Sequence, residues 1–382
     1  MSAAPRQAPG AADARTVLAH DYLLVLRGAE RVFAQMADMR PGAPILTLLY
    51  DLQATAGRFA AHEVRTSPLQ RLGAAQRNFR RLLPLFPWAV GRLKVPACEV
   101  LLSSSSAFMH GLKAPPDAVH VCYCHAPFRY AWYEQARALS EAPPPLRPAL
   151  AGMLAAIRRW DLAASRRVDR YVANSRLTQE RIARYYGRES EIVHPPVDTE
   201  RFAPGEPGEE LLIVSELVRH KRLTVALEAA RRAGAPIRVA GSGPDHAALA
   251  EAFPEAQFLG RVDDAELERM YATARAVLVP SMEEFGITAV EAQAAGRPVI
   301  AAAAGGALET VIDGVTGRLV ALDDVDGFRV AIEELDRFGF EQAEALRNAR
   351  RFSIEAFRRG LNAQVERALE GGRRLGTRAG RA

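Results

Sequence analysis

The stretch Ala276-Val-Leu-Val-Pro-Ser-Met-Glu-Glu-Phe-Gly-Ile-Thr-Ala-Val-Glu-Ala-Gln-Ala-Ala-Gly-Arg-Pro-Val-Ile300 decides the fold class. Ala276–Val279 is a short apolar run that ends at a proline, which predicts a buried parallel strand. Thr288–Ala295 has the composition of a helix, and a glycine and a proline follow it as stop signals. Val299–Ala302 is then the next strand. The stretch therefore predicts a strand–helix–strand unit of a parallel sheet.

Polar residues fill the loop between the first strand and the helix, namely Ser281, Glu283, Glu284 and Gly286. In open α/β sheets, ligands bind beyond the carboxyl ends of the strands. The free N–H groups and the dipole of a helix N-terminus attract phosphate at the same place. The loop therefore predicts a binding site for a ligand that contains phosphate.

The acids Glu283 and Glu291 would repel a phosphate, so we expect each to face hydroxyl groups, because an ionised carboxylate only accepts hydrogen bonds. Glu283 precedes the helix and Glu291 lies about one turn inside it. The two could hold opposite ends of one ligand. The alternative stays open that both are ordinary acids that complement the helix dipole.

The composition limits the classes of protein to which the chain can belong. The chain has 382 residues, of which 49% are hydrophobic, enough for two domains of ordinary size. No apolar run reaches transmembrane length, and the first fifteen residues lack the apolar segment of a secretory signal. Cys98, Cys122 and Cys124 are too few for a disulfide framework, which favours a reduced cytoplasm. The net charge of +5 suits anionic partners.

Short apolar strands alternate with helices along the chain, which predicts an α/β protein with doubly wound parallel sheets. The expected strands are Thr16–His20, Ile45–Tyr50, Val100–Leu102, Val119–Tyr123, Arg170–Ala173, Glu191–Val193, Leu211–Val214, Ile237–Ala240, Gln257–Leu259, Ala276–Val279 and Val299–Ala302. Pro195 and Pro196 predict a stiff crossing between two domains. The expected parts are a disordered lead-in at 1–15, domains at 16–194 and 195–351, a helix at 352–370 that crosses back to the first domain, and a disordered basic tail at 371–382.

Three segments carry a resemblance to a known family. Glu283–Ile300 resembles the E-x7-E signature of the retaining glycosyltransferases of family 4. His20-Asp21-Tyr22-Leu23, followed by Gly28, resembles the N-terminal loop of these enzymes. Tyr123-Cys-His-Ala-Pro-Phe-Arg-Tyr130 resembles a segment of a bacterial mannosyltransferase-like subgroup. The resemblance implies the GT-B fold, with two Rossmann-like domains that face a central cleft.

The resemblance also implies roles for individual residues. The implied catalytic residues are His125 beside the transferred sugar, Glu283 on the sugar hydroxyls and Lys221 on the donor diphosphate. Arg129 and Tyr130 are expected on the acceptor side. The implied donor-binding residues are Gly28, Arg219, Arg222, Gly243, Arg261, Val262, Glu284, Phe285, Gly286, Ile287 and Glu291, the last of these on the ribose.

One residue departs from the family pattern. Glu216 stands where an arginine is common, whereas Lys221 matches. An acid that faces a diphosphate is unfavourable by Coulomb's law. Either Glu216 points away and Arg219 or Arg222 supplies the second positive charge, or donor binding is weakened.

The implied reaction moves a hexose from a nucleotide sugar to a hydroxyl of a glycan or lipid-linked acceptor, with no metal or other cofactor. GDP-mannose is the first expected donor and a UDP-sugar the second. No side chain is an evident nucleophile, so we expect a front-face mechanism. A nicotinamide-dependent dehydrogenase is disfavoured, because the first loop has one glycine instead of G-x-G-x-x-G. A weakly active protein that serves as a scaffold in polysaccharide assembly is the other interpretation.

Residues 65–94 contain arginines and a lysine but no acid, interleaved with leucine, phenylalanine and tryptophan. Such a mixture suits an anionic membrane surface. The alternative is an amphipathic segment that packs on its own domain and exposes a basic face to water. The expected location is therefore the cytoplasm, with peripheral contact to the plasma membrane as an option. No nucleic-acid partner is expected.

Overall fold

The structure is a computed structural model that describes residues 15–72 and 79–379. Almost all of the expected lead-in, residues 1–14, lies outside the described residues. The chain divides into two compact units. The N-terminal unit comprises Met1–Asn174, Thr178–Val193 and Arg358–Ala382, and the C-terminal unit comprises Ser175–Leu177 and His194–Phe357.

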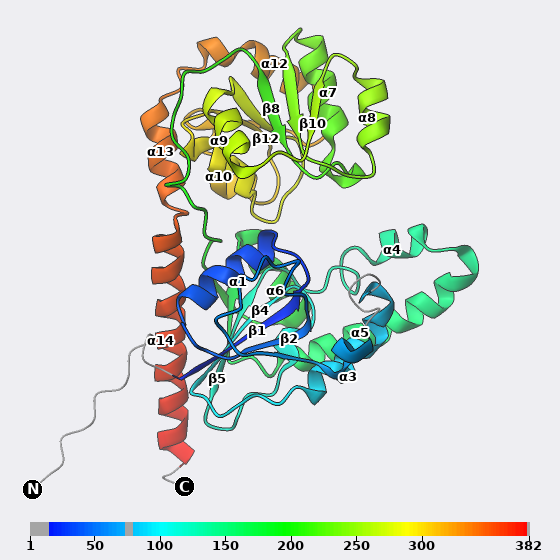
Figure 1. Cartoon of the computed structure of the whole chain (residues 1–382), viewed down its shortest axis with the longest axis vertical. Helices are drawn as coiled ribbons and strands as arrows, with labels where there is room; N and C mark the ends of the chain where they lie inside the picture. The colour runs from blue at the N-terminus through cyan, green and yellow to red at the C-terminus, as the bar shows by residue number, and fades with distance from the viewer. Residues whose placement is uncertain (1–14, 73–78, 380–382) are drawn as a thin grey trace, which may run out of the picture. The chain divides into compact units, whose positions relative to one another are not determined.

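A seven-stranded parallel sheet forms the middle of the N-terminal unit (Figure 1). Its strand order is β3-β2-β1-β4-β5-β6-β7. The strands are β1 (Thr16–Leu23), β2 (Ile45–Tyr50), β3 (Val64–Thr66), β4 (Val100–Ser105), β5 (Val119–Cys124), β6 (Arg170–Ala173) and β7 (Ser190–Ile192). The direction in which strands are added reverses between β1 and β4. The carboxyl ends of these two strands therefore border the crevice in which such folds bind ligands.

Helices and short 3-10 turns connect the strands of this sheet. They are α1 (Gly28–Asp38), η1 (Pro68–Leu72), η2 (Phe79–Leu85), α3 (Phe86–Arg92), η3 (Met109–Gly111), α4 (Gln135–Glu141), η4 (Pro144–Leu146), α5 (Arg147–Ser165) and α6 (Arg176–Tyr186). The main core lies between the sheet, α3, η3 and α5. β4 and β5 are buried along their whole length, as expected for central parallel strands covered on both faces.

Helix α14 (Ile354–Ala379) belongs, from Arg358 onward, to the N-terminal unit. Its Asn362 accepts a hydrogen bond from Arg40 at 2.7 Å, and its Gln364 accepts one from Arg170 at 2.7 Å. The helix continues past 370, through a stretch expected to be disordered. Arginine, leucine and alanine in that stretch are good helix formers despite the glycines. Residues 380–382 lie outside the described part.

The C-terminal unit holds a six-stranded parallel sheet in the order β10-β9-β8-β11-β12-β13. The strands are β8 (Leu211–Val214), β9 (Ile237–Ala240), β10 (Gln257–Gly260), β11 (Ala276–Val279), β12 (Val299–Ala302) and β13 (Gly317–Val320). The order reverses between β8 and β11, so the ligand edge of this unit lies where these two strands end.

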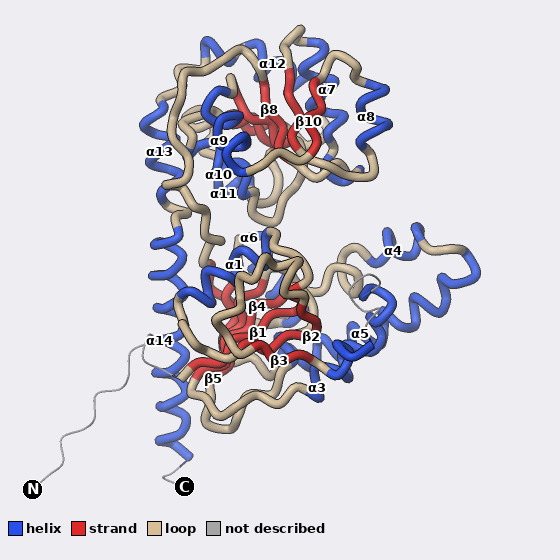
Figure 2. The backbone as a smooth tube through the Cα atoms, in the orientation of Figure 1, coloured by secondary structure: helices blue, strands red, loops and turns tan. Residues whose placement is uncertain are grey.

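Two apolar cores sandwich this second sheet, one on each face. Figure 2 shows the helices of this unit beside its strands. Helices α7 (Leu223–Arg232), α8 (His246–Ala252) and α12 (Val325–Glu333) contribute to the first core. Helices α9 (Asp264–Thr273), α10 (Ile287–Ala294), α11 (Ala307–Thr310) and α13 (Gln342–Arg350) contribute to the second. Turns η5 (Arg219–Lys221) and η6 (Leu335–Arg337) complete the unit.

The expected doubly wound parallel sheets are confirmed. Two strands were not predicted, β3 and β13, and both are edge strands, with three and four residues; the other two edge strands, β7 and β10, were predicted. Edge strands are only partly buried and carry a weak apolar signal. Within residues 15–72 and 79–379, no helix combines the length and apolar character needed to cross a membrane.

Candidate active site

Lys221 and Glu283 meet at the ligand edge of the C-terminal sheet. The loop after β8 carries Lys221 and the loop after β11 carries Glu283. Lys221 Nζ donates hydrogen bonds to both carboxylate oxygens of Glu283, at 2.7 and 2.6 Å. The structure thus pairs two residues, 62 positions apart in sequence, for which the sequence predicted separate catalytic roles.

The surroundings of Glu283 keep it ionised. Burial alone would raise its pKa, but the charge and hydrogen bonds of Lys221 outweigh burial and lower it. The Ser281 hydroxyl also donates to the carboxylate, and the charge of nearby His220 acts in the same direction. The sequence analysis named Ser281 only as a polar residue of the loop, without a role, and His220 was not among the predicted site residues.

Two glycines hold the Glu283 loop in place. Gly306 N donates to the Glu283 carbonyl at 2.8 Å. A Cβ atom on Gly305 would lie 2.2 Å from the same carbonyl oxygen, and one on Gly306 would lie 2.1 Å from the Phe285 carbonyl oxygen. These glycines pack against the Glu283 loop, and any side chain on them would displace it.

The segment after Glu283 leads into the N-terminus of α10. Gly286 adopts a left-handed conformation, with φ of +86°, and Ile287 begins the helix. Phe285 is buried, and its ring centroid lies 5.5 Å from that of His194 and 5.4 Å from that of Phe352. Its side chain therefore anchors the loop in the core, and the backbone N–H groups at the helix start are what a ligand could contact. Glu284 is half-buried in the same loop.

Glu291 lies inside α10, and its Oε2 accepts a hydrogen bond from the Tyr271 hydroxyl at 2.8 Å. Tyr271 comes from α9 and is fully buried, and burial raises its pKa well above the usual value. It therefore acts as a hydrogen-bond donor that fixes one carboxylate oxygen of Glu291. Tyr271 could not be predicted, because its contact with α10 arises only when the two helices pack.

The loop after β8 distinguishes the two candidate arginines. Arg222 forms an ion pair with Asp323 and adopts a left-handed conformation, with φ of +54°. Arg219 is exposed on η5, and so is Glu216 earlier in the loop. The sequence left two arginines open as the second cation. Arg222 already neutralises the carboxylate of Asp323, whereas Arg219 is exposed.

The remaining predicted donor residues lie around the ends of β9 and β10. A Cβ atom on Gly243 would lie 2.1 Å from the Leu217 carbonyl oxygen, so this glycine lets the turn after β9 pack on the loop after β8. Arg261 is exposed, and Val262 packs against the core beneath α10. Gly243 thus has a structural reason to be glycine that is independent of any ligand.

In the N-terminal unit, three polar side chains meet at the ligand edge, where β1, β4 and β5 end. Ser104 Oγ lies 3.0 Å from His20 Nδ1 and 2.8 Å from His125 Nε2. All three residues are buried, and His125 retains an exposure of 9%. Phe33 stacks on the His20 ring with centroids 4.8 Å apart. The predicted His125 is therefore held by Ser104, which the sequence analysis did not single out.

Asp21 fixes the turn beside these residues. Its buried carboxylate accepts hydrogen bonds from the backbone N–H groups of Ala107, Phe108 and Met109, at 3.0, 2.8 and 2.8 Å. The Ser105 hydroxyl donates to it as well, at 3.1 Å. The partners are more than eighty positions away in sequence, so this role of Asp21 could not be predicted.

The remaining predicted residues of this unit are less enclosed. Gly28 is the first residue of α1, and a Cβ atom there would meet nothing within 4 Å. Arg129 is half-buried, and its Nη1 lies 3.8 Å from Glu134 Oε1. Tyr130 is half-buried, with its ring 5.7 Å from that of Phe128. The predicted acceptor-side pair thus lies on the segment between β5 and α4, in which Phe128 and Ala131 are buried.

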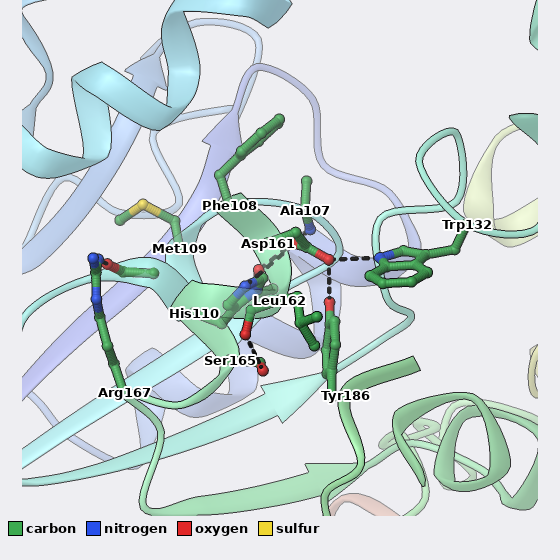
Figure 3. Close-up of polar contacts among 12 residues, drawn as sticks. Ala107, Phe108, Met109, His110, Trp132, Asp161, Leu162, Ser165, Arg167 and Tyr186 are labelled. Atoms are coloured by element: carbon green, nitrogen blue, oxygen red, sulfur yellow. Dashed lines mark hydrogen bonds and ion pairs between the residues drawn. The ribbon is translucent and has the colours of Figure 1, made fainter. Parts of the chain in front are cut away.

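A buried carboxylate holds this segment to the core (Figure 3). Asp161 of α5 accepts hydrogen bonds from Trp132 Nε1 at 2.7 Å and from the Tyr186 hydroxyl at 2.9 Å. Its other oxygen lies 3.3 Å from His110 Nε2. Burial raises the pKa of Asp161, although His110, Trp132 and Tyr186 each act to lower it. Trp132 thereby fixes the chain two residues after Tyr130.

We expect Asp161→Ala to lower the free energy of unfolding by about 3–5 kcal/mol, because it leaves the Trp132 and Tyr186 donors without their acceptor and His110 without the carboxylate beside it. Asp161→Asn should lose less, since the amide oxygen can still accept from Trp132 and Tyr186. Urea unfolding of both variants measures the difference. Equal losses for the two would mean that the volume of the side chain, and not its hydrogen bonds, supports this region.

We expect the stability that Glu283 contributes to depend on pH. A carboxyl whose pKa is lowered on folding stabilises the fold above its unfolded value, here 4.5, and loses that contribution as the pH falls through the folded value. Glu283→Gln should therefore cost about 2 kcal/mol at pH 7 and progressively less below pH 4.5. Unfolding curves of wild type and variant at several pH values check this, and a difference independent of pH would argue against the ion pair.

Two family models match the chain. The model described as Glycosyltransferase Family 4 matches residues 28–201, and the one described as Glycosyl transferases group 1 matches residues 197–351. A D-inositol 3-phosphate glycosyltransferase from Mycobacterium sp. (strain KMS) is 35% identical over 185 residues, which are 41% of this chain and 42% of the relative. A protein of that name from Frankia alni is 36% identical over 167 residues, 34% of this chain and 40% of its own. The match thus spans about two fifths of these curated relatives.

Solved structures resemble the chain along nearly its whole length. Anabaena HepE in complex with UDP-glucose has a TM-score of 0.63 and 18% identity, over 93% of this chain and 99% of HepE. Sucrose-phosphate synthase from Thermosynechococcus elongatus has a TM-score of 0.68 and 18% identity, over 94% and 100%. At such identities the likeness shows the fold, which is GT-B. With this fold, and with two models that together span residues 28–351, the chain belongs to the glycosyltransferases of family 4.

Proposed function

We propose that the protein transfers a hexose, with retention, from a nucleoside diphosphate sugar to a hydroxyl of a glycan or lipid-linked acceptor. The observation that carries this proposal is the Lys221–Glu283 pair at the reversal point of the C-terminal sheet. It combines a cation, a carboxylate held ionised and the N-terminus of α10. Such a set can bind a diphosphate and sugar hydroxyls side by side.

The pair would be exchanged when the donor binds. Lys221 would leave Glu283 for the diphosphate, and Glu283 would then accept hydrogen bonds from the sugar hydroxyls. Negative charge grows on the departing nucleoside diphosphate in the transition state, where Lys221 and the N–H groups at the start of α10 would stabilise it. Arg219, which is exposed, is the better candidate for a second cation, because Arg222 is held by Asp323. In this account protein cations neutralise the leaving group in place of a metal.

The other ends of the donor have candidate partners as well. Glu291, oriented by Tyr271, would accept hydrogen bonds from the ribose. To His125 we assign the contact with the transferred sugar that the family resemblance implies. We propose a front-face reaction, in which the acceptor hydroxyl attacks on the side of the leaving group. Trapping of a glycosyl group covalently bound to the protein would overturn that mechanism.

GDP-mannose is the donor that we propose first, from the resemblance of Tyr123–Tyr130 to a mannosyltransferase-like segment. A UDP-sugar is the second candidate, and the HepE structures with UDP and UDP-glucose favour testing it. D-inositol 3-phosphate belongs among the acceptors to be tried, since the curated relatives are named for it.

We expect Lys221→Ala to weaken binding of the correct nucleotide about 10- to 100-fold, the loss of one charge-assisted contact of about 1.5–3 kcal/mol. Isothermal calorimetry with GDP-mannose, GDP, UDP-glucose and UDP measures the effect and identifies the base. Arg232→Ala, which removes an exposed cation at the far end of α7, is the control and should bind like wild type.

Equal affinity of wild type and Lys221→Ala would argue against the proposed diphosphate site. If wild type bound none of the four nucleotides, the scaffold interpretation would replace the transferase. Transfer of labelled sugar to an acceptor then separates the two directly, because a scaffold gives no product.

We further propose peripheral contact with an anionic membrane through the region of η2 and α3. Leu85 and Trp88 are large apolar side chains with exposures of 44% and 49%. Arg92 is exposed and lies over the Trp88 ring at 5.5 Å, and Lys94 is exposed beside it. Residues 73–78, in the middle of the basic segment 65–94, lie outside the described part. An exposed tryptophan among basic residues suits a membrane interface.

We expect Trp88→Ala to reduce binding to vesicles that contain phosphatidylserine, and added salt to weaken the binding of wild type. Leu52→Ala removes an equally exposed side chain, at 51%, outside this region and should have no effect. Co-sedimentation measures both. Binding that is unaffected by Trp88→Ala would place any membrane contact elsewhere on the protein.

A further inference from the structure

A chain of polar side chains leads away from His125 into the N-terminal unit. His125 Nε2 lies 2.8 Å from Ser104 Oγ, and Ser104 Oγ lies 3.0 Å from His20 Nδ1. His20 Nε2 in turn lies 4.0 Å from Glu30 Oε1. Within the part of the chain that the structure describes, Ser104 is the hydrogen-bonding partner of the His125 ring.

The number of protons in this series of hydrogen-bonded side chains is limited. A serine hydroxyl has one hydrogen to donate and two lone pairs to accept with. If Ser104 donates to one of the two flanking ring nitrogens, it must accept from the other. The ring nitrogen that carries a proton on His20 therefore determines which nitrogen carries one on His125.

Glu30 determines the direction of the hydrogen bonds in this series. Its pKa is lowered: burial would raise it, but His20 and the backbone N–H groups at the start of α1 lower it. A ring nitrogen with a lone pair would be repelled by this carboxylate, so Nε2 of His20 keeps its proton. At a pH at which His20 carries only this one proton, its Nδ1 is an acceptor for the Ser104 hydroxyl. Ser104 consequently accepts from Nε2–H of His125.

His125 is itself a neutral imidazole. Burial lowers its pKa to about 3, and the neighbouring His20 acts in the same direction, whereas Glu30 opposes it. A neutral ring has one proton, so a proton on Nε2 leaves a lone pair on Nδ1.

We propose that His20 and Ser104 are positioning residues that keep the proton of His125 on Nε2, so that Nδ1 is offered as an acceptor to a hydroxyl of the transferred sugar. The proposal rests on the proposed function, which gives His125 its contact with the sugar. It adds a requirement for specificity: the sugar must present a hydroxyl that donates at this position, and the corresponding deoxy sugar is a poor substrate.

The experiment is a long-range ¹⁵N–¹H correlation spectrum of the full chain with ¹⁵N-labelled histidine, without substrate. Neutral histidines protonated on Nε2 and on Nδ1 give different coupling patterns. The chain has eight histidines, and the signals that His125→Gln removes identify those of His125. We expect wild-type His125 to show the Nε2–H pattern. The Nδ1–H pattern in wild type overturns the proposal, whatever the variants do.

The variants test whether Ser104 is the cause. Ser104→Ala should convert the His125 signals to a mixture of the two forms, and Ser104→Thr, which keeps the hydroxyl, should restore the Nε2–H pattern. The control is Ser103→Ala, on the opposite face of β4. Ser103 Oγ lies 2.7 Å from Nε2 of the buried His120, an equivalent pair away from the site. This control should leave His125 unchanged. An unchanged His125 pattern in Ser104→Ala overturns the proposal.

Kinetics separate this proposal from the proposed function. Ser104→Ala should lower kcat at least 10-fold, with an unchanged nucleotide Kd, because the residues proposed to bind the nucleotide phosphates and ribose are in the C-terminal unit. Ser104→Thr should recover most of the rate. A normal kcat in Ser104→Ala with an altered tautomer overturns the proposal and leaves the transferase intact. Absence of transfer by wild type refutes the proposed function, while the spectrum still decides the tautomer.

Discussion

In a parallel sheet every strand ends at the same edge, and a reversal of strand order makes two neighbouring loops diverge there. This constraint governs both units of the protein. In the C-terminal unit the reversal lies between β8 and β11, and the loops that follow them carry Lys221 and Glu283. In the N-terminal unit it lies between β1 and β4, which pair His20 with Ser104 in register. Each unit thus gathers its polar side chains at the one place where its sheet topology leaves room for a ligand.

A buried carboxylate needs hydrogen-bond donors. The kind of donor distinguishes a carboxylate with a structural role from one that could bind a ligand. Asp21 is satisfied mainly by backbone N–H groups, and Asp161 by the side chains of core residues, none of which a ligand could replace. Glu283 is different, because its main partner is the flexible, partly exposed side chain of Lys221. Under the proposed function, that partner would be exchanged for the hydroxyls of a sugar while the lysine moved to a phosphate. Hydrogen bonding to buried carboxylates therefore stabilises the regions around Asp21 and Asp161, whereas Glu283 has a partner that a ligand could replace.

Much of the fold could be predicted from the sequence, because central parallel strands are apolar throughout and stand out between glycine and proline signals. The edge strands β3 and β13 were not predicted, although the edge strands β7 and β10 were; in β3 and β13 an exposed arginine, Arg65 or Arg318, interrupts an already short run. Lys221, Glu283 and His125 could be chosen from motifs. Ser104, Asp21 and Tyr271 could not, because their contacts depend on strand register and helix packing between distant segments. Likewise the ion pair of Arg222 with Asp323, about one hundred residues away, could not be predicted from the loop that carries Arg222.

The exchange of partners at Glu283 is the central claim, and a crystal structure of the full chain with its nucleotide sugar tests it most directly. The donor to use is whichever of GDP-mannose and UDP-glucose binds in calorimetry. The account predicts that Lys221 Nζ lies on the diphosphate and that Glu283 accepts from the sugar hydroxyls, with the diphosphate at the N-terminus of α10. A donor bound elsewhere, with Lys221 still paired to Glu283, would contradict it.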